Sequence, residues 1–151
     1  MRIVVAGTGY VGLVTGVCLA HKGHYVTCLD IDSQKIELMK KGISPIFEPD
    51  LEDLMRENMQ RLEFTTDYKA AYQNADVIFI AVGTPEKKDG SANLTYVFEA
   101  ARQVAQCVEN NCIVVVKSTV PVGTNDKVEA IIRQTAKQGL KICVESNPEF
   151  L

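Results

Sequence analysis

The sequence has little of what a metal site, a nucleic-acid interface or a membrane span requires. It holds two histidines, His21 and His24, and its five cysteines form no Cys-x-x-Cys pair, so the usual spacing of metal ligands is missing. The net charge is −3 with no basic stripe, which argues against nucleic acid and anionic membranes as partners. The apolar runs have the length of strands, far short of the roughly 20 residues of a transmembrane helix. We expect a cytoplasmic protein.

The length of the chain and the positions of its cysteines indicate the number of domains and the role of the thiols. A chain of 151 residues is long enough for one hydrophobic core, so we expect a single domain, residues 1–151. Every cysteine lies in an apolar segment, where an inert buried thiol is the usual outcome. These cysteines are Cys18, Cys28, Cys107, Cys112 and Cys143.

A glycine-rich loop near the N-terminus is the most informative motif present. It reads Gly7-x-Gly9-x-x-Gly12, directly after an apolar run, and Asp30 closes the next apolar run. In a dinucleotide site, Gly7 permits the turn off the strand, Gly9 lets the backbone approach a pyrophosphate, and Gly12 lets the helix pack on the sheet. Asp30 would accept a hydrogen bond from the ribose 2′-OH and would repel a 2′-phosphate. The motif therefore predicts NAD rather than NADP.

The glycine loop has other uses, and these remain alternatives. Flavin sites and methyl-donor-dependent transferases use similar loops, the latter also with an acid after the second strand. Lys35 places a cation near Asp30 that could bind a 2′-phosphate. The alternative is that Lys35 is only a solvated lysine on a helix surface.

Strand and helix patterns alternate along the whole chain. The candidate strands are Arg2–Ala6, Tyr25–Leu29, Leu62–Thr65, Val77–Val82, Cys112–Lys117 and Lys141–Val144. Most are continuously apolar, as strands covered on both faces are, so we predict an α/β, Rossmann-type, doubly wound parallel sheet of six strands in the order 3-2-1-4-5-6. Helices are expected at Ser33–Lys41, Asp50–Gln60 with Asp50 as N-cap, and Asp67–Gln73. A buried helical stripe is expected at Val11, Val14, Thr15 and Cys18.

Three polar residues follow the later strands, at the sheet edge where such folds bind ligands. Thr84 and Thr119 could orient an amide, a ribose or a water, or they could simply be turn residues. Glu149 lies beside Phe150 and Leu151, whose apolar side chains would lower its solvation, a setting that suits a general base. A solvated loop glutamate is the alternative.

Five motifs in order resemble the UDP-glucose 6-dehydrogenase family of nucleotide-sugar dehydrogenases. They are Val5-Ala6-Gly7-Thr8-Gly9-Tyr10-Val11-Gly12, Leu29-Asp30-Ile31-Asp32, Val82-Gly83-Thr84-Pro85, Lys117-Ser118-Thr119-Val120-Pro121-Val122-Gly123-Thr124 and Asn147-Pro148-Glu149-Phe150-Leu151. The resemblance covers the entire chain. The run Ser118–Gly123 is similar to the UDP-glucose members, whereas GDP-mannose relatives tend to carry Leu-Pro-Gly after Ser-Thr-Val.

The resemblance implies oxidation of a sugar primary alcohol to a carboxylate with two NAD. Thr119 would help hold the water or alcohol, and Glu149 would act with water in the second half-reaction. The residues implied to contact NAD are Gly7, Gly9, Tyr10, Val11, Gly12, Asp30, Lys35, Thr84, Ser118 and Thr119. Those implied to border the UDP-sugar substrate are Glu149, Phe150 and Leu151.

The nucleophilic cysteine of the family lies in a later domain, and none of the five cysteines matches its context. We therefore expect an NAD-binding domain that binds NAD without turnover, within a longer and homodimeric parent that also has a central helix and a substrate domain. A sister enzyme acting on GDP-mannose or UDP-N-acetylmannosamine, or a stand-alone NAD-binding module, is the alternative.

Overall fold

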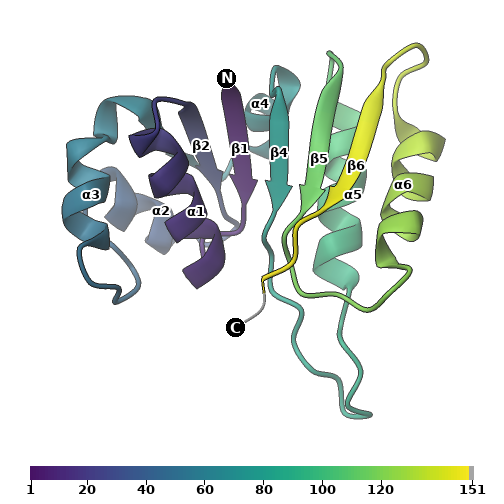
Figure 1. Cartoon of the computed structure of the whole chain (residues 1–151), viewed down its shortest axis with the longest axis horizontal. Coiled ribbons are helices and arrows are strands. Elements are labelled where there is room, and N and C mark those ends of the chain that lie inside the picture. The colour runs from purple at the N-terminus through teal and green to yellow at the C-terminus, as the bar shows by residue number, and fades with distance from the viewer. Residues whose placement is uncertain (150–151) are drawn as a thin grey trace.

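The structure, a computed structural model, describes residues 1–149 and alternates strands with helices (Figure 1). The strands are β1 (Arg2–Ala6), β2 (Tyr25–Leu29), β3 (Leu62–Thr65), β4 (Val77–Ile80), β5 (Cys112–Val116) and β6 (Ile142–Ser146). The helices are α1 (Tyr10–His21), α2 (Ser33–Lys40), α3 (Leu51–Glu57), α4 (Tyr68–Gln73), α5 (Thr95–Cys107) and α6 (Thr124–Thr135), with a 3-10 turn at Met59–Arg61.

The strands form one parallel sheet in the order β3-β2-β1-β4-β5-β6, which confirms the predicted doubly wound architecture. The strand order reverses between β1 and β4, so the connections from these two strands diverge at the carboxyl edge of the sheet. That divergence opens a crevice there, as it does in other sheets of this class. In Figure 1 this edge is at the bottom, with the loop from β4 to α5 and the segment after β6.

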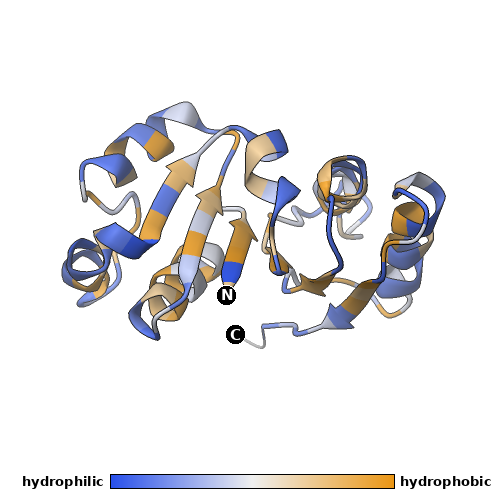
Figure 2. Ribbon diagram, turned by 90° about the horizontal axis from the view of Figure 1, so that it is seen from above, coloured by the Kyte–Doolittle hydropathy of each residue, from blue (hydrophilic) through white to orange (hydrophobic). Residues whose placement is uncertain are grey.

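Helices lie on both faces of the sheet, and each face has its own core (Figure 2). On one face α1, α2 and α3 pack over the half of the sheet that begins the chain, with Val5, Leu13 and Met39 fully buried. On the other face α4, α5 and α6 cover the sheet, with Ile78 and Val104 fully buried. The nearly continuous apolar strands supply side chains to both cores.

The buried stripe predicted for α1 is wrong. The residues of α1 that face the sheet are Gly12, Leu13, Gly16, Val17 and Ala20. The predicted stripe is partly exposed instead, and Cys18 is exposed. The helix is apolar almost all round, so periodicity alone allows more than one buried face. The glycines decide it, because a Cβ on Gly16 would lie 2.8 Å from Cys28 Sγ.

Two other predictions hold only in part. Asp50 is the N-cap residue of α3, as predicted, but it has a left-handed conformation, φ 65°, and its side chain makes no capping hydrogen bond. The Asp67 side chain, by contrast, caps α4 by accepting from the N–H groups of Lys69 and Ala70. The cysteine prediction holds for Cys28 and Cys112, which are buried. Cys107 is partly buried, and the remaining two, Cys18 and Cys143, are exposed. Burial raises the pKa of Cys28 to about 12, so this thiol stays protonated at neutral pH.

Candidate functional site

A cleft of about 710 Å³ lies at the carboxyl edge of the sheet, between the glycine loop and the ends of β4 and β5. It gathers most of the predicted site residues, namely Gly7, Gly9, Tyr10, Val11, Asp30, Lys35, Thr84, Ser118, Thr119 and Glu149. Gly12 lies behind the cleft, where it packs against Gly7. Phe150 and Leu151, predicted to border the substrate, lie outside the described residues.

The three glycines of the loop have two different roles. Gly7 adopts φ +101°, and a Cβ there would lie 2.8 Å from the carbonyl carbon of Ala81 and closer still to its oxygen. A Cβ on Gly12 would likewise meet the Gly7 carbonyl group. A Cβ on Gly9, by contrast, would have no atom within 4 Å. Gly7 and Gly12 are therefore needed for packing, whereas Gly9 keeps space open.

The open space at Gly9 lies at the N-terminus of α1. Gly9 is the N-cap residue of this helix and supplies no side-chain cap. The first backbone N–H groups of a helix have no partner within it, and they carry the positive end of the helix dipole. This arrangement suits an anion such as a pyrophosphate, and the residues present fit one.

Asp30, at the end of β2, is bound to the glycine loop. Its Oδ2 accepts hydrogen bonds from the Thr8 hydroxyl and from the Thr8 N–H at 2.8 Å, and its Oδ1 accepts one from the Asp32 N–H at 2.9 Å. Burial raises the pKa of Asp30, but these hydrogen bonds, with the charge of Lys35, hold it below its ordinary value. A carboxylate has about four acceptor positions, so three hydrogen bonds leave room for one more donor.

Hydroxyl groups join the three chain segments that leave β4, β5 and β6. The Thr84 hydroxyl donates to the carbonyl oxygen of Thr119 at 3.0 Å, and the Thr119 hydroxyl donates to that of Glu149 at 3.3 Å. The Ser118 hydroxyl donates to the Val82 carbonyl oxygen at 2.7 Å. The hydroxyl groups of Thr84, Ser118 and Thr119 thus tie together the segments that line the cleft.

Lys117 also lines the cleft, although the sequence predicted no role for it. Its ammonium lies 2.8 Å from Glu149 Oε2 and donates to Asn147 Oδ1 at 3.1 Å. The Lys117 side chain is only 12% exposed, so this pair is partly shielded from solvent. The signal was available, because Lys117 opens the Lys-Ser-Thr motif whose next two residues were both selected.

Glu48, which contacts a residue of the cleft, was also not predicted from the sequence. The Tyr10 hydroxyl, at the start of α1, donates to Glu48 Oε2 at 2.7 Å. This hydrogen bond, followed by desolvation and the negative charges of Glu48 and Glu149, raises the pKa of Tyr10. Two carboxylates from distant parts of the chain therefore lie near one phenol at the rim of the cleft.

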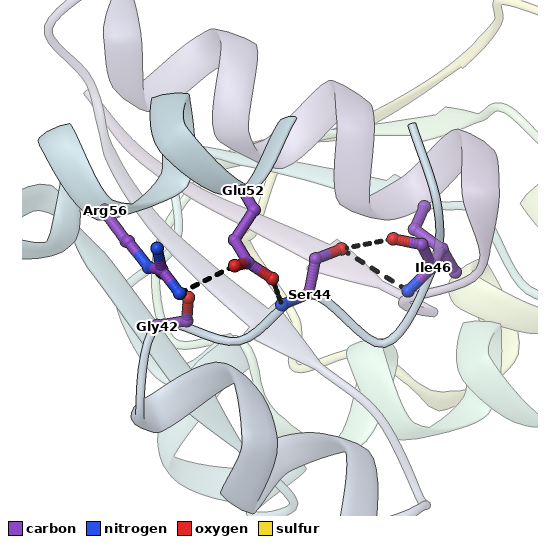
Figure 3. A network of polar contacts seen from close by, with 5 residues as sticks. All are labelled: Gly42, Ser44, Ile46, Glu52 and Arg56. Atoms are coloured by element: carbon purple, nitrogen blue, oxygen red, sulfur yellow. Dashed lines mark hydrogen bonds and ion pairs between the residues drawn. The ribbon is translucent and has the colours of Figure 1, made fainter. Parts of the chain in front are cut away.

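A polar network holds the loop that carries Glu48 (Figure 3). Arg56 of α3 donates to the Gly42 carbonyl oxygen at 3.0 Å and pairs with Glu52 at 2.6 Å. Glu52 accepts from the Ser44 N–H at 3.0 Å, and the Ser44 hydroxyl donates to the Ile46 carbonyl oxygen at 2.8 Å. The loop is thereby tied to α3 and directed toward the glycine loop.

Within the described residues, 1–149, no three His, Cys, Asp or Glu side chains gather as metal ligands would. In the same residues, no helix has both the length and the apolar character needed to cross a bilayer. The expected cytoplasmic location stays a prediction.

Comparison with known proteins gives consistent matches. Residues 1–151 match the UDP-glucose/GDP-mannose dehydrogenase family, NAD binding domain. UDP-glucose 6-dehydrogenase YwqF of Bacillus subtilis is 57% identical over all of this chain, and UDP-glucose 6-dehydrogenase of Rhizobium meliloti is 53% identical. The chain spans only 35% of the length of each of these relatives.

Solved structures agree with this assignment. A UDP-glucose dehydrogenase from the archaeon Pyrobaculum islandicum superposes with a TM-score of 0.93 at 41% identity, over 99% of this chain and 36% of that one. A GDP-mannose dehydrogenase from Pseudomonas aeruginosa superposes with a TM-score of 0.94 at 43% identity, over 100% and 36%. The glycine loop, the acid that ends β2 and the match along the whole chain lead to one conclusion: this protein belongs to the UDP-glucose/GDP-mannose dehydrogenase family, in which it corresponds to the NAD binding domain.

Proposed function

We propose that residues 1–151 form the single NAD-binding domain of a UDP-glucose 6-dehydrogenase, a homodimeric enzyme that oxidises UDP-glucose to UDP-glucuronate with two NAD. The observation that carries the proposal is the convergence of the Gly9 opening, Asp30, Thr119 and Glu149 on one cleft. The first two suit a dinucleotide, and the last two are the residues that the family resemblance connects with the sugar alcohol and with water.

The chain's own groups would hold NAD at two places. The N–H groups at the start of α1 would bind the pyrophosphate through the space left at Gly9. The one remaining acceptor position of Asp30 would take the ribose 2′-OH, while its negative charge would disfavour a 2′-phosphate. Lys35 lines the same end of the cleft. When bound, NAD supplies the hydride acceptor of the reaction.

Glu149 and Lys117 would serve the hydration step that an acid product requires. Oxidation of an alcohol to a carboxylate passes through the aldehyde level and adds one oxygen atom from water. Lys117 fixes one carboxylate oxygen of Glu149 at 2.8 Å, and the other oxygen would accept a hydrogen bond from that water. Thr119, whose hydroxyl is anchored on the Glu149 carbonyl oxygen, would position the water or the alcohol.

Covalent catalysis would need a nucleophile from outside these residues. All five cysteines lie in the described part of the chain, and none of them lines the cleft. A nucleophile must reach the substrate, so the chain by itself is expected to bind NAD without turnover. The GDP-mannose dehydrogenase superposition keeps a sister substrate as a second candidate.

The test is to isolate the protein at its native length, with an antibody raised against residues 1–151, and to assay it. We expect a band well above 16.6 kDa, two NADH formed per UDP-glucose, and slower turnover of GDP-mannose and UDP-N-acetylmannosamine. Faster turnover of either other sugar would reassign the substrate. A band at 16.6 kDa that binds NAD without turnover would leave a stand-alone binding module.

A further inference from the structure

The helix layer formed by α1, α2 and α3 covers one face of the sheet over β1 to β3 but does not extend to β5 and β6. Residues paired in register on neighbouring parallel strands share a face, and one such row runs Ile3, Val77, Ile113, Cys143. Ile3 is 3% exposed beneath α1, Val77 is partly buried, Ile113 is 42% exposed and Cys143 is exposed. Burial is therefore lost step by step from β1 to β6 along this face.

A second row on the same face repeats the trend. Val5 is fully buried, its partners Phe79 and Val115 are partly buried, and Glu145 on β6 is exposed. The opposite face of β5 behaves differently, because α5 and α6 cover it and its side chains remain buried. Among residues 1–149, Figures 1 and 2 show helices on only one side of β5 and β6.

An uncovered face of this kind is unusual for a parallel sheet, whose faces are normally both packed. β5 reads Cys-Ile-Val-Val-Val, so its exposed side is as apolar as its buried side. Ile113 and Val115 belong to neither of the two buried clusters nor to their packed margins. Apolar surface in a contiguous patch marks an interaction site.

We propose that this uncovered face, formed by Ile113, Val115 and Cys143 and bordered by Val77 and Phe79, which pack against the core under α1, is the docking site for one amphipathic α-helix. The helix is supplied by the part of the parent protein outside these 151 residues. The inference rests on the proposed function to the extent that it needs a longer parent. The helix packs beside α1 and completes the layer that α1 begins.

The dimensions fit a single helix. Three strands about 4.8 Å apart make a face about 10 Å wide, which is the diameter of one helix with its side chains. A five-residue strand is about 17 Å long and is spanned by about 11 helical residues. The exposed Glu145 at the rim calls for a cationic or polar residue where the helix passes it.

The length of the relatives and the position of the residues after β6 both point to this occupant. Relatives match this chain over only 35% of their length, so proteins of that size have ample residues to supply a helix. Glu149, which follows β6, pairs with Lys117, the next residue in alternation after Ile113 and Val115. Residues 147–149 therefore lie beside the carboxyl end of β5, next to the uncovered face.

The thiol of Cys143 is a natural probe of this face. The native-length protein is treated with iodoacetamide, and the alkylation rates of Cys143 and Cys18 are measured by peptide mass spectrometry, each relative to its rate in urea. Both thiols are exposed in residues 1–149, and Cys28 serves as the buried reference. We expect Cys143 to react at least tenfold more slowly than Cys18. Equal rates in a protein longer than 16.6 kDa would overturn the docking site while leaving the proposed function intact.

A second experiment identifies the occupant. Ile113→p-benzoylphenylalanine is introduced into the native-length protein, and light and heavy isotope copies are mixed before irradiation. We expect crosslinks to one peptide outside residues 1–151, within single copies only. Crosslinks between copies would show that a second molecule covers the face and would refute the proposal. The matched control places the same photoreactive residue at Tyr25, 63% exposed on β2, where no crosslink to that peptide is expected.

Discussion

Replacing Gly12 with alanine should destabilise the fold, whereas replacing Gly9 with alanine in the same loop should leave the fold stable and weaken NAD binding. In Gly12→Ala the new Cβ would lie 2.9 Å from the Gly7 carbonyl carbon and closer still to its oxygen. Both are backbone atoms, so no side-chain rotation relieves the clash, and α1 must move off the sheet. In Gly9→Ala the new Cβ meets nothing within 4 Å, and the φ of −70° suits any residue.

The magnitudes follow from these contacts. Overpacking against rigid backbone costs about 3 kcal/mol, and the better helix propensity of alanine returns about 1 kcal/mol. Gly12→Ala should therefore lose about 2 kcal/mol of unfolding free energy, which lowers the Tm by roughly 6 °C for a domain of this size. Gly9→Ala should change stability by less than about 1 kcal/mol, because it alters only a weak cap. It should nonetheless weaken NAD binding at least tenfold by filling the space meant for the pyrophosphate.

Thermal unfolding followed by circular dichroism and NAD titration by calorimetry check the two variants side by side. Each variant is the control for the other, because Gly12→Ala should change the Tm through packing and Gly9→Ala should change NAD affinity through access to the site. The reasoning is refuted if Gly12→Ala keeps the wild-type Tm, or if Gly9→Ala binds NAD with wild-type affinity.

Three further predictions concern the polar groups of the cleft. Asp30→Asn removes the charge that opposes a 2′-phosphate, so the preference for NAD over NADP should fall at least tenfold in calorimetric titrations, and an unchanged ratio would contradict the assignment. Thr8→Val removes a hydrogen bond that lowers the pKa of Asp30 and should cost about 2 kcal/mol in urea unfolding at pH 7. That stabilisation is present above the ordinary pKa of Asp30 and is lost as pH falls through the lower folded value, so the two proteins should converge in acid and not in base. Lys117→Gln frees Glu149 and should lower kcat of the parent enzyme at least tenfold with NAD affinity within twofold, whereas unchanged kcat would exclude Lys117 from positioning Glu149.

The strand order was predictable because alternating apolar strands and helices leave few connected topologies. The buried face of α1 was not, since a helix apolar on most sides offers several possible faces. A stripe drawn from side chains alone left out Gly12, which the loop motif places against the sheet, and Gly16. The exposure of Cys143 escaped prediction for a related reason. An apolar strand predicts cover on both faces, yet within residues 1–149 no helix lies over the open side of β6.

The contacts of the site likewise divide into those that the sequence predicts and those that only the structure shows. Residues joined to a strand end by a few positions, such as Asp30 and Thr119, could be placed from the motif and the sheet order. The Tyr10–Glu48 hydrogen bond joins positions 38 residues apart, and it depends on the path of a loop held by Arg56 and Glu52. No local pattern encodes that path, so pairings of this kind become visible only with coordinates.

The bonding of Asp30 bears on attempts to redesign cofactor preference. The usual way to admit NADP is to replace the acid at the end of the second strand with a neutral or cationic residue. Here the same carboxylate also supports the glycine loop, since it accepts hydrogen bonds from the Thr8 N–H and hydroxyl of the loop that we propose binds the pyrophosphate. A substitution chosen only for the 2′-phosphate would loosen the binding of both cofactors at once. A successful switch must therefore bring its own acceptor for Thr8, so that selectivity and the shape of the loop are engineered together.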